Sequence, residues 1–328
     1  MTIIECPEKL AHRLVEGDFE PSAMAETLTQ MAARGETPRE ITALVNAFRN
    51  ASVPVRTRHE AVLDLCGTGG APSHTFNVST ISSFVVASLG VPVAKHGNRS
   101  NLGACGSADV LEALGANITL GPEEAGAILN EIGFTFLFAQ VYHPAMRNAA
   151  PVRKRLRSRT ALNMLGPLLN PVQAKRRQLI GVYSPDLLDL LPPVLDAIGV
   201  ERALIVHGFP GMDEISVVDR TGVAELDHGK VERYVIDPRV VGMYHPCPAE
   251  IRDLPPPQAA LVAREVLSGV TGTRRDMVLL NAACGLIAYG EADDLDVAIR
   301  KCERAIDSGM ALAKLEAYIA RSNAVRSS

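Results

Sequence analysis

Residues 64–109 of this 328-residue chain read DLCGTGGAPSHTFNVSTISSFVVASLGVPVAKHGNRSNLGACGSAD. The mostly apolar run 61–65 predicts a buried strand, three glycines follow within 67–70, and the apolar stretch 81–89 has the length of a helix. Glycines let backbone N–H groups turn toward a ligand, and a helix N-terminus adds unpaired donors and partial positive charge. This order of strand, glycine loop and helix predicts a phosphate-binding site.

The same arrangement follows a second time. Residues 91–94 predict another strand, which continues into the polar run 95–99, Lys-His-Gly-Asn-Arg. A second loop of small residues, 103–107, then opens a helix at 109–112. Two anion-binding loops so close in sequence suggest one ligand that carries phosphate at both ends.

The bulk composition is that of a globular protein, with 47% hydrophobic and 21% charged residues. The net charge of -4 gives no general attraction to nucleic acid, and the apolar runs are too short to span a bilayer. The first ten residues lack a basic segment followed by an apolar one, so we expect no signal peptide and a cytoplasmic location. Six cysteines without CxxC spacing argue against a zinc site.

Residues 7–50 predict short helices, because apolar side chains recur there at helical spacing. Within them, residues 37–40 read Thr-Pro-Arg-Glu, which has the form of a capping box with proline at the first helical position. Residues 51–60 have the character of a linker. We therefore expect a small helical domain at 1–55, which part of the later helices can join, and an α/β domain at 56–328.

Strands and helices alternate from residue 61 onward, which predicts an α/β fold with a mostly parallel central sheet covered on both faces. Turn signals at Thr221-Gly222 and at 228–230 predict hairpins within 216–237. The chain returns to helices after residue 258, and the run 275–288 is apolar almost all round, which predicts a buried helix. Prolines 192 and 193 are expected to kink or restart a helix over 187–197. The predicted strands are 61–65, 91–94, 117–120, 134–139, 179–183 and 203–207.

Asp213 and Glu214 follow the predicted strand 203–207 and a turn at 208–211. Ligands of α/β folds bind at the C-terminal ends of parallel strands, and adjacent carboxylates there suit a hard cation such as Mg²⁺. A solvated acidic turn has the same sequence, but the two phosphate loops favour the metal interpretation.

A basic run extends from Arg147 to Arg159, just after His143. Such a run is usually a solvated face. Alternatively, one arginine points inward and pairs with a substrate carboxylate through its planar fork of donors. Residue chemistry alone leaves open which arginine that would be, and a lone histidine is more often structural than catalytic.

Seven short motifs occur in a consistent order between residues 61 and 320. They are Gly67-Thr68-Gly69-Gly70, Asn77-Val78-Ser79-Thr80, Lys95-His96-Gly97-Asn98-Arg99, Gly106-Ser107-Ala108-Asp109, Arg159-Thr160, Gly166-Pro167 and Asp213-Glu214. Together they resemble the motifs of the anthranilate phosphoribosyltransferases. The resemblance implies a type III phosphoribosyltransferase fold, with a small N-terminal helical domain and a large α/β domain, and a homodimer formed through the small domain. It implies a transferase of tryptophan biosynthesis that moves the phosphoribosyl group from 5-phosphoribosyl 1-diphosphate (PRPP) to anthranilate, with two Mg²⁺ ions per active site.

The resemblance also assigns residues to each part of the site. It implies a donor site lined by Gly67, Gly70, Thr75, Asn77, Ser79, Thr80, Lys95 and Ser107. The implied metal ligands are Ser79, Asp213 and Glu214. The residues implied to face anthranilate are Gly67, Asn98, His143 and Arg153, with Arg153 meeting its carboxylate.

The chain departs from the family pattern at Ala71-Pro72, where Asp-Gly is usual, and again at 156–158. The metal pair and the phosphate loops are unaffected. Three alternatives stay open: a paralogue acting on another aromatic acceptor, a nucleoside phosphorylase of the same broad fold, and a non-catalytic relative that binds a nucleotide or nucleic acid. The last two give Asp213 and Glu214 no clear role, so the transferase is preferred.

Overall fold

The computed structural model describes residues 6–100 and 103–324, and its centre is a seven-stranded sheet in the order β3-β2-β1-β4-β5-β6-β7. The strands are β1 (Val55–Gly67), β2 (Val93–Gly97), β3 (Phe134–Phe138), β4 (Val172–Gly181), β5 (Val200–Gly208), β6 (Thr221–Asp227) and β7 (Lys230–Ile236). The first five pair in parallel, and β6 and β7 are antiparallel additions at one edge. The predicted mostly parallel α/β fold is confirmed.

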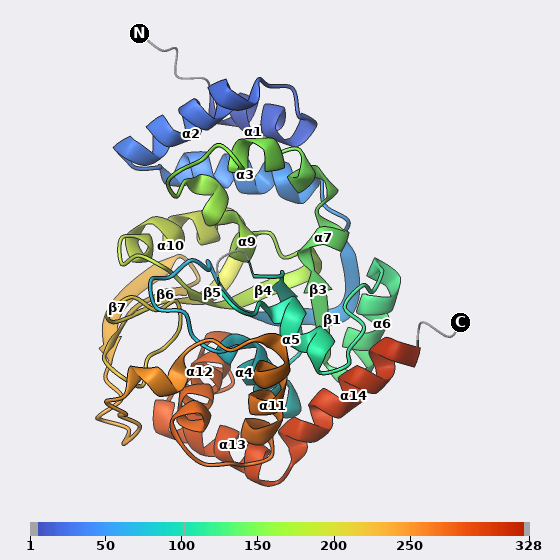
Figure 1. The fold of residues 1–328 in the computed structure, drawn as a ribbon, viewed down its shortest axis with the longest axis vertical. Coiled ribbons are helices and arrows are strands. Elements are labelled where there is room, and N and C mark those ends of the chain that lie inside the picture. Colours follow the sequence, from blue (N-terminus) through green and yellow to red (C-terminus); the bar gives the residue numbers. More distant parts are fainter. Residues whose placement is uncertain (1–5, 101–102, 325–328) are drawn as a thin grey trace.

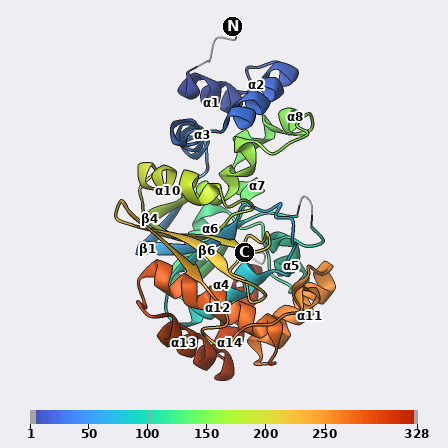
Figure 2. The same cartoon turned by 90° about the vertical axis from the view of Figure 1, so that its left-hand side faces the viewer.

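The N-terminal helices lie at one end of the molecule, and the C-terminal helices lie on the opposite side of the sheet (Figures 1 and 2). The first group is α1 (Pro7–Glu16), α2 (Pro21–Arg34) and α3 (Pro38–Asn50). The predicted capping box of α3 is present: Glu40 N donates to Thr37 Oγ1 at 3.3 Å, and Thr37 N donates to Glu40 Oε2 at 2.9 Å.

The apolar core of these helices includes later parts of the chain. It continues through α8 (Ala150–Arg153), α9 (Leu165–Leu168) and α10 (Leu187–Ala197) to one face of β4 and β5. Residues beyond 55 therefore contribute to the helical end of the molecule, and the division at residue 55 stays a prediction.

The other face of the sheet is covered by α4 (Val78–Ser88), α12 (Thr273–Tyr289), α13 (Leu295–Asp307) and α14 (Met310–Ala324). As predicted, α12 is apolar almost all round and buried. No described helix has both the length and the apolar character needed to cross a membrane. The remaining elements are α5 (Ser107–Ala113), α6 (Pro122–Ile132), α7 (Ala139–Tyr142), α11 (Pro256–Leu267) and the 3₁₀ turns η1 (Pro144–Arg147), η2 (Ala161–Asn163) and η3 (Pro248–Ile251).

The strand order reverses between β1 and β4. From β1 the chain proceeds outward through β2 and β3, then returns to place β4 on the other side of β1. The final pair in the β1–β4 register is Gly67 opposite Gly181, so both strands end at the same edge. In open α/β sheets such a switch point is where ligands bind.

Among the predicted local structures, the linker and one strand are wrong. Residues 51–60 are not a linker, because β1 already begins at Val55 and its first half pairs with β4. Residues 117–120 form no strand: the Asn117 side chain accepts hydrogen bonds from Thr119 N and Oγ1 at 3.1 and 2.9 Å, and Asn117 N donates to Ser322 Oγ at 3.1 Å. Side chains thus provide hydrogen-bond partners for backbone groups of this segment, which a neighbouring strand would otherwise have to provide.

Helix α10 runs unbroken through Pro192 and Pro193, against expectation. Its buried leucine face packs on β5 and α3, and packing of this kind outweighs local propensity in most protein helices. The turn predicted at Thr221-Gly222 is also wrong, since these residues begin β6. The hairpin turn at residues 228–229 is confirmed, with φ of 48° and 81° as a two-residue turn of this hand requires.

Candidate active site

The switch point is shaped by glycines that make room for Asp213. A Cβ on Gly67 would lie 2.7 Å from Asp213 Oδ2, and a Cβ on Gly181 would lie 1.6 Å from the Asp213 carbonyl oxygen. Gly69 has a φ of +68°, and its N–H donates to Asp213 Oδ2 at 2.9 Å. The first glycine loop, residues 67–77, is therefore fixed to the acidic pair that follows β5.

Lys95 and Ser79 extend this contact toward Glu214. Lys95 is buried in the middle of β2, and its Nζ donates to the Leu65 carbonyl at 2.5 Å and to Ser79 Oγ at 3.2 Å. Ser79, in the first turn of α4, lies near Glu214, and its N–H and hydroxyl favour the ionised form of that carboxyl group. An ammonium has three donors, so Lys95 keeps one beyond these two bonds.

The acidic pair has the chemistry of a metal site. Burial raises the pKa of Asp213, and burial together with the negative charge of Asp213 raises the pKa of Glu214 to about 8. Carboxyl groups with raised pKa values lack a positive charge nearby that would stabilise their ionised form, and a divalent cation supplies such a charge.

The number of protein ligands also fits Mg²⁺. Among the described residues, no group of three or more His, Cys, Asp and Glu is placed to hold a metal. Two carboxylates and the Ser79 hydroxyl leave coordination positions for phosphate and water, which is how Mg²⁺ is usually bound beside phosphate substrates.

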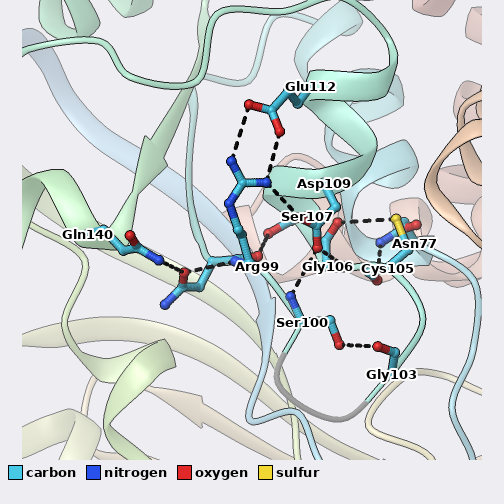
Figure 3. Close-up of polar contacts among 11 residues, drawn as sticks. Asn77, Arg99, Ser100, Gly103, Cys105, Gly106, Ser107, Asp109, Glu112 and Gln140 are labelled. Atoms are coloured by element: carbon cyan, nitrogen blue, oxygen red, sulfur yellow. Dashed lines mark hydrogen bonds and ion pairs between the residues drawn. The ribbon is translucent and has the colours of Figure 1, made fainter. Parts of the chain in front are cut away.

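The second loop, residues 98–107, is organised by Asp109 at the start of α5 (Figure 3). Asp109 Oδ2 accepts the N–H groups of Gly106 at 2.8 Å and Ser100 at 3.1 Å. Arg99 pairs with Asp109 and Glu112, each at 2.8 Å. A Cβ on Gly106 would lie 2.4 Å from Ser100 N, so this close approach of backbone requires glycine. The side chains of α5 therefore hold the described part of the loop in one conformation.

Asn77 and Ser107 are among the predicted donor residues that these contacts bring together. Asn77 Nδ2 donates to the Cys105 carbonyl at 3.0 Å, which joins the two loops. Asn77 Oδ1 is buried and has no partner among the described residues, so it is available to a ligand hydroxyl. Ser107 Oγ donates to the Asn98 carbonyl at 3.2 Å. A Cβ on Gly97 would lie 2.2 Å from that hydroxyl, so β2 must also end in glycine.

The other predicted donor residues differ in exposure. Thr75 is half-buried and forms a backbone bridge with Arg252. Gly70 is half-buried, and its carbonyl accepts a hydrogen bond from Arg159, whose guanidinium lies 4.4 Å from the Tyr183 ring centre. Thr80 is buried in α4, which leaves its side chain little surface for a ligand.

His143 and His96 form a buried pair. Their Nε2 atoms lie 3.1 Å apart, and His96 Nδ1 lies 3.1 Å from the Gly166 carbonyl. A carbonyl only accepts, so His96 Nδ1 carries the proton, and His143 is assigned as the donor between the two rings. Burial lowers the pKa of His143 to about 4 and that of His96 to about 3, so both rings are neutral at pH 7.

Sequence reasoning missed His96 and Asp64 as parts of the site. Asp64 Oδ1 accepts His96 N at 3.1 Å, and Asp64 Oδ2 accepts Asn170 Nδ2 at 2.9 Å beneath the two loops. Burial raises the pKa of Asp64 to about 6. A polar residue at the C-terminal end of a predicted parallel strand was a signal for His96, whereas nothing local indicates the partners of Asp64.

The remaining predicted acceptor residues are less closely connected. Asn98 is exposed, and its Oδ1 accepts Gln140 Nε2 at 3.4 Å (Figure 3). Arg153 Nη2 donates to the Leu162 carbonyl at 3.1 Å. Arg153, His143 and Asn98 lie on separate elements. Among the described residues, no hydrogen bond joins Arg153 to either of the other two.

A cavity of about 280 Å³ lies elsewhere, between the β5–β7 side of the sheet and α12. None of the predicted site residues lines it. Arg202 and Glu225 in its wall lie 3.9 Å apart as an ion pair, and Tyr234 donates to Glu225 at 2.9 Å. The candidate site is thus defined by its loops and carboxylates.

The sheet is mostly parallel, and its strand order reverses at a switch point. Two phosphate loops and a pair of carboxylates that suits Mg²⁺ lie there. These features define an α/β protein that binds a phosphorylated ligand. A family model described as "Glycosyl transferase family, a/b domain" matches residues 59–312. Over 307 residues the chain is 44% identical to anthranilate phosphoribosyltransferase of Moorella thermoacetica, covering 94% of this chain and 90% of that protein. The chain belongs to this glycosyl transferase family and, within it, to the anthranilate phosphoribosyltransferases.

Solved structures agree in fold. The anthranilate phosphoribosyltransferase of Thermus thermophilus matches with a TM-score of 0.91 and 38% identity, covering 98% of this chain and 96% of that one. The enzyme of Saccharomyces cerevisiae in complex with PRPP and Mg matches with a TM-score of 0.88 and 25% identity, covering 97% and 94% of the two chains. The family and fold predicted from the sequence motifs are therefore confirmed.

Proposed function

We propose that this protein transfers the phosphoribosyl group from PRPP to anthranilate, giving N-(5-phosphoribosyl)anthranilate and diphosphate in tryptophan biosynthesis. The observation that carries this proposal is the continuous set of contacts at the switch point. Hydrogen bonds join the first glycine loop to Asp213 and Lys95 to Ser79, and Ser79 lies near Glu214. Relatives that share 44% of their residues with this chain are named for the same reaction.

The donor site follows from the two loops. In the reaction the bond between ribose C1 and the diphosphate oxygen breaks, so negative charge grows on the diphosphate and positive charge grows on the ribose. Backbone N–H groups and the remaining donor of Lys95 stabilise the leaving diphosphate. We assign donor binding to Gly67, Gly70, Thr75, Asn77, Ser79, Thr80, Lys95 and Ser107.

Ser79, Asp213 and Glu214 would hold Mg²⁺, and we propose two ions per site. The metal supplies positive charge that neutralises the diphosphate. In the Saccharomyces structure Mg and PRPP are bound together in that protein. Here Asp213 and Glu214 are adjacent and half-buried near Ser79, so carboxylate and hydroxyl oxygens are available to a metal ion.

The acceptor is proposed to meet Gly67, Asn98, His143 and Arg153. The amine of anthranilate is neutral at pH 7 and forms a bond to C1 as the diphosphate leaves, after which a proton passes from nitrogen to solvent. No strong base is required, so positioning supplies most of the catalysis. The neutral imidazole pair offers an uncharged polar surface, and the Arg153 fork suits the carboxylate of the acceptor. A structure of the Saccharomyces enzyme is a complex with 4-fluoroanthranilate.

We further propose that residues 1–55 form the small domain and 56–328 the large one, that the protein is a homodimer through the small domain, and that it acts in the cytoplasm. The apolar core that the N-terminal helices share with α8, α9 and α10 supports a small helical domain that later parts of the chain join. Sedimentation would test the dimer, by comparing the unaltered protein with a variant in which residues of the exposed helical surface are substituted.

The first test is a fluorescence assay with purified protein, Mg²⁺, PRPP and anthranilate. Loss of anthranilate fluorescence that requires every component supports the proposal. No loss, with PRPP binding still detected by calorimetry, would instead indicate another aromatic acceptor. If PRPP does not bind and nucleic acid binds with a steep dependence on salt, the protein is a non-catalytic relative.

A further inference from the structure

The segment of residues 248–253, here called the strap, runs between β7 and α11 and contains η3. Building on the proposed function, we infer that Asp253 of the strap is a positioning residue that sets the spacing of the two donor loops. It contacts both loops at once, and none of the sequence motifs indicates it.

The strap pairs with the first loop through its backbone. Phe76 N donates to the Ile251 carbonyl at 3.0 Å, and Asp253 N donates to the His74 carbonyl at 3.2 Å. Thr75 lies between them and forms an antiparallel bridge with Arg252. These contacts span the part of the loop that includes Thr75, which is proposed to bind the donor.

The side chain of Asp253 then reaches the second loop. Its Oδ2 accepts the N–H of Ala104 at 2.8 Å, and a Cβ on Gly103 would lie only 3.2 Å from the same oxygen. Among the described residues, one hydrogen bond joins the two loops directly, from Asn77 to the Cys105 carbonyl. Asp253 therefore provides a second connection, through a residue that belongs to neither loop.

The strap has a firm base on the N-terminal end of α12. Thr273 donates to the Glu250 carboxylate, and Arg274 Nε donates to the Glu250 carbonyl at 2.9 Å. His245 lies 3.1 Å from the Thr273 hydroxyl and 2.7 Å from Asp276 Oδ2. Helix α12 is buried beneath the sheet, so the position of the strap is fixed relative to β1 and α4.

This arrangement matters because PRPP carries phosphate at both ends. A ligand of that kind binds well only when the two anion-binding loops are held at the right separation, since ordering them on binding costs free energy. Loss of the Asp253 carboxylate frees the Ala104 end of the second loop and weakens the donor complex. Of the four acceptor residues, His143 and Arg153 lie on other elements, so anthranilate binding is expected to change less than PRPP binding.

The test compares Asp253→Ala with Asp253→Asn, which keeps an acceptor oxygen at the same place. Asp294→Ala is the matched control, because Asp294 Oδ1 accepts Val297 N at 2.8 Å at the start of α13, away from the loops. We expect Asp253→Ala to raise the KM for PRPP about tenfold, as loss of a hydrogen bond to a charged acceptor implies. The KM for anthranilate should rise by less than the KM for PRPP, and Asp253→Asn should restore the KM for PRPP to within about threefold.

Hydrogen exchange of the peptide containing residues 103–107 provides a readout that is independent of catalysis. Faster exchange in Asp253→Ala, but not in Asp294→Ala, supports the inference. Unchanged exchange with an unchanged KM for PRPP overturns it, as does an equal rise in the KM of both substrates. If the unaltered protein fails to bind PRPP by calorimetry, the proposed function fails instead, and unchanged loop exchange would then still overturn the positioning role.

Discussion

Replacement of Gly67 by alanine tests how the first loop and the acidic pair depend on each other. The new Cβ would lie 2.7 Å from Asp213 Oδ2, whereas ordinary contacts begin near 3.4 Å, so the carboxylate must move by about 0.7 Å. That shift breaks the 2.9 Å hydrogen bond from Gly69 N to the same oxygen. A hydrogen bond to a charged group contributes about 1.5–3 kcal/mol, which corresponds to a fall in kcat/KM of about 10- to 100-fold.

The assay is loss of anthranilate fluorescence over a range of Mg²⁺ concentrations, with thermal unfolding measured alongside. Gly69→Ala is the matched control: its φ of +68° is strained for alanine by about 1 kcal/mol, but nothing lies within 4 Å of the new Cβ. We expect the Gly67 variant to require more Mg²⁺, and the Gly69 variant to lose stability more than activity. Wild-type Mg²⁺ dependence in Gly67→Ala, or equal loss of activity in both variants, would refute the steric argument.

Three further predictions concern the charged and titrating groups. Asp213→Asn combined with Glu214→Gln should lower Mg²⁺-dependent turnover by at least about 100-fold while thermal unfolding shows a folded protein, since the carboxylates serve the ligand and not the core; full turnover would remove them from the mechanism. Lys95→Met should weaken PRPP binding at least about tenfold by calorimetry, because the variant loses a buried hydrogen-bond donor to phosphate. Burial lowers the pKa of His143 to about 4, so the unfolded chain takes up a proton that the folded chain does not, and stability falls as the pH drops from about 6.5 to about 4. Urea unfolding across that range should show a smaller loss for His143→Gln than for the unaltered protein, and identical curves would contradict the shift.

Local sequence patterns were enough to predict the order of elements around the site. The glycines after β1, the turn into α4 and the carboxylates after β5 depend on neighbours in sequence, and all three lie at the expected edge of the sheet. Contacts between distant residues could not be predicted in this way. The bond from Gly69 to Asp213 joins residues 144 positions apart, and the bond from Ala104 to Asp253 spans 149 positions.

The errors have the same origin. Nothing within residues 117–120 reveals that Asn117 and Ser322 supply the hydrogen bonds of that segment, because Ser322 lies on the last helix. The prolines of α10 locally disfavour a helix, but packing against β5 outweighs that preference. Likewise, the roles of Gly97 and Gly181 become apparent only when the chain brings Ser107 and Asp213 against them.

The departure at Ala71-Pro72 shows how packing can replace a polar anchor in this loop. Ala71 is buried, and Ser73 N donates to the Gly211 carbonyl at 3.1 Å. A Cβ on Gly211 would lie 3.4 Å from Pro72, so the exposed ring lies beside the turn that leads into Asp213. The first loop is therefore joined to the region of the acidic pair at two places, by the Gly69 hydrogen bond to Asp213 and by the Ser73 hydrogen bond to Gly211. Because proline fixes its own φ, Pro72 restricts the loop in the absence of ligand and lowers the entropy lost when the donor binds.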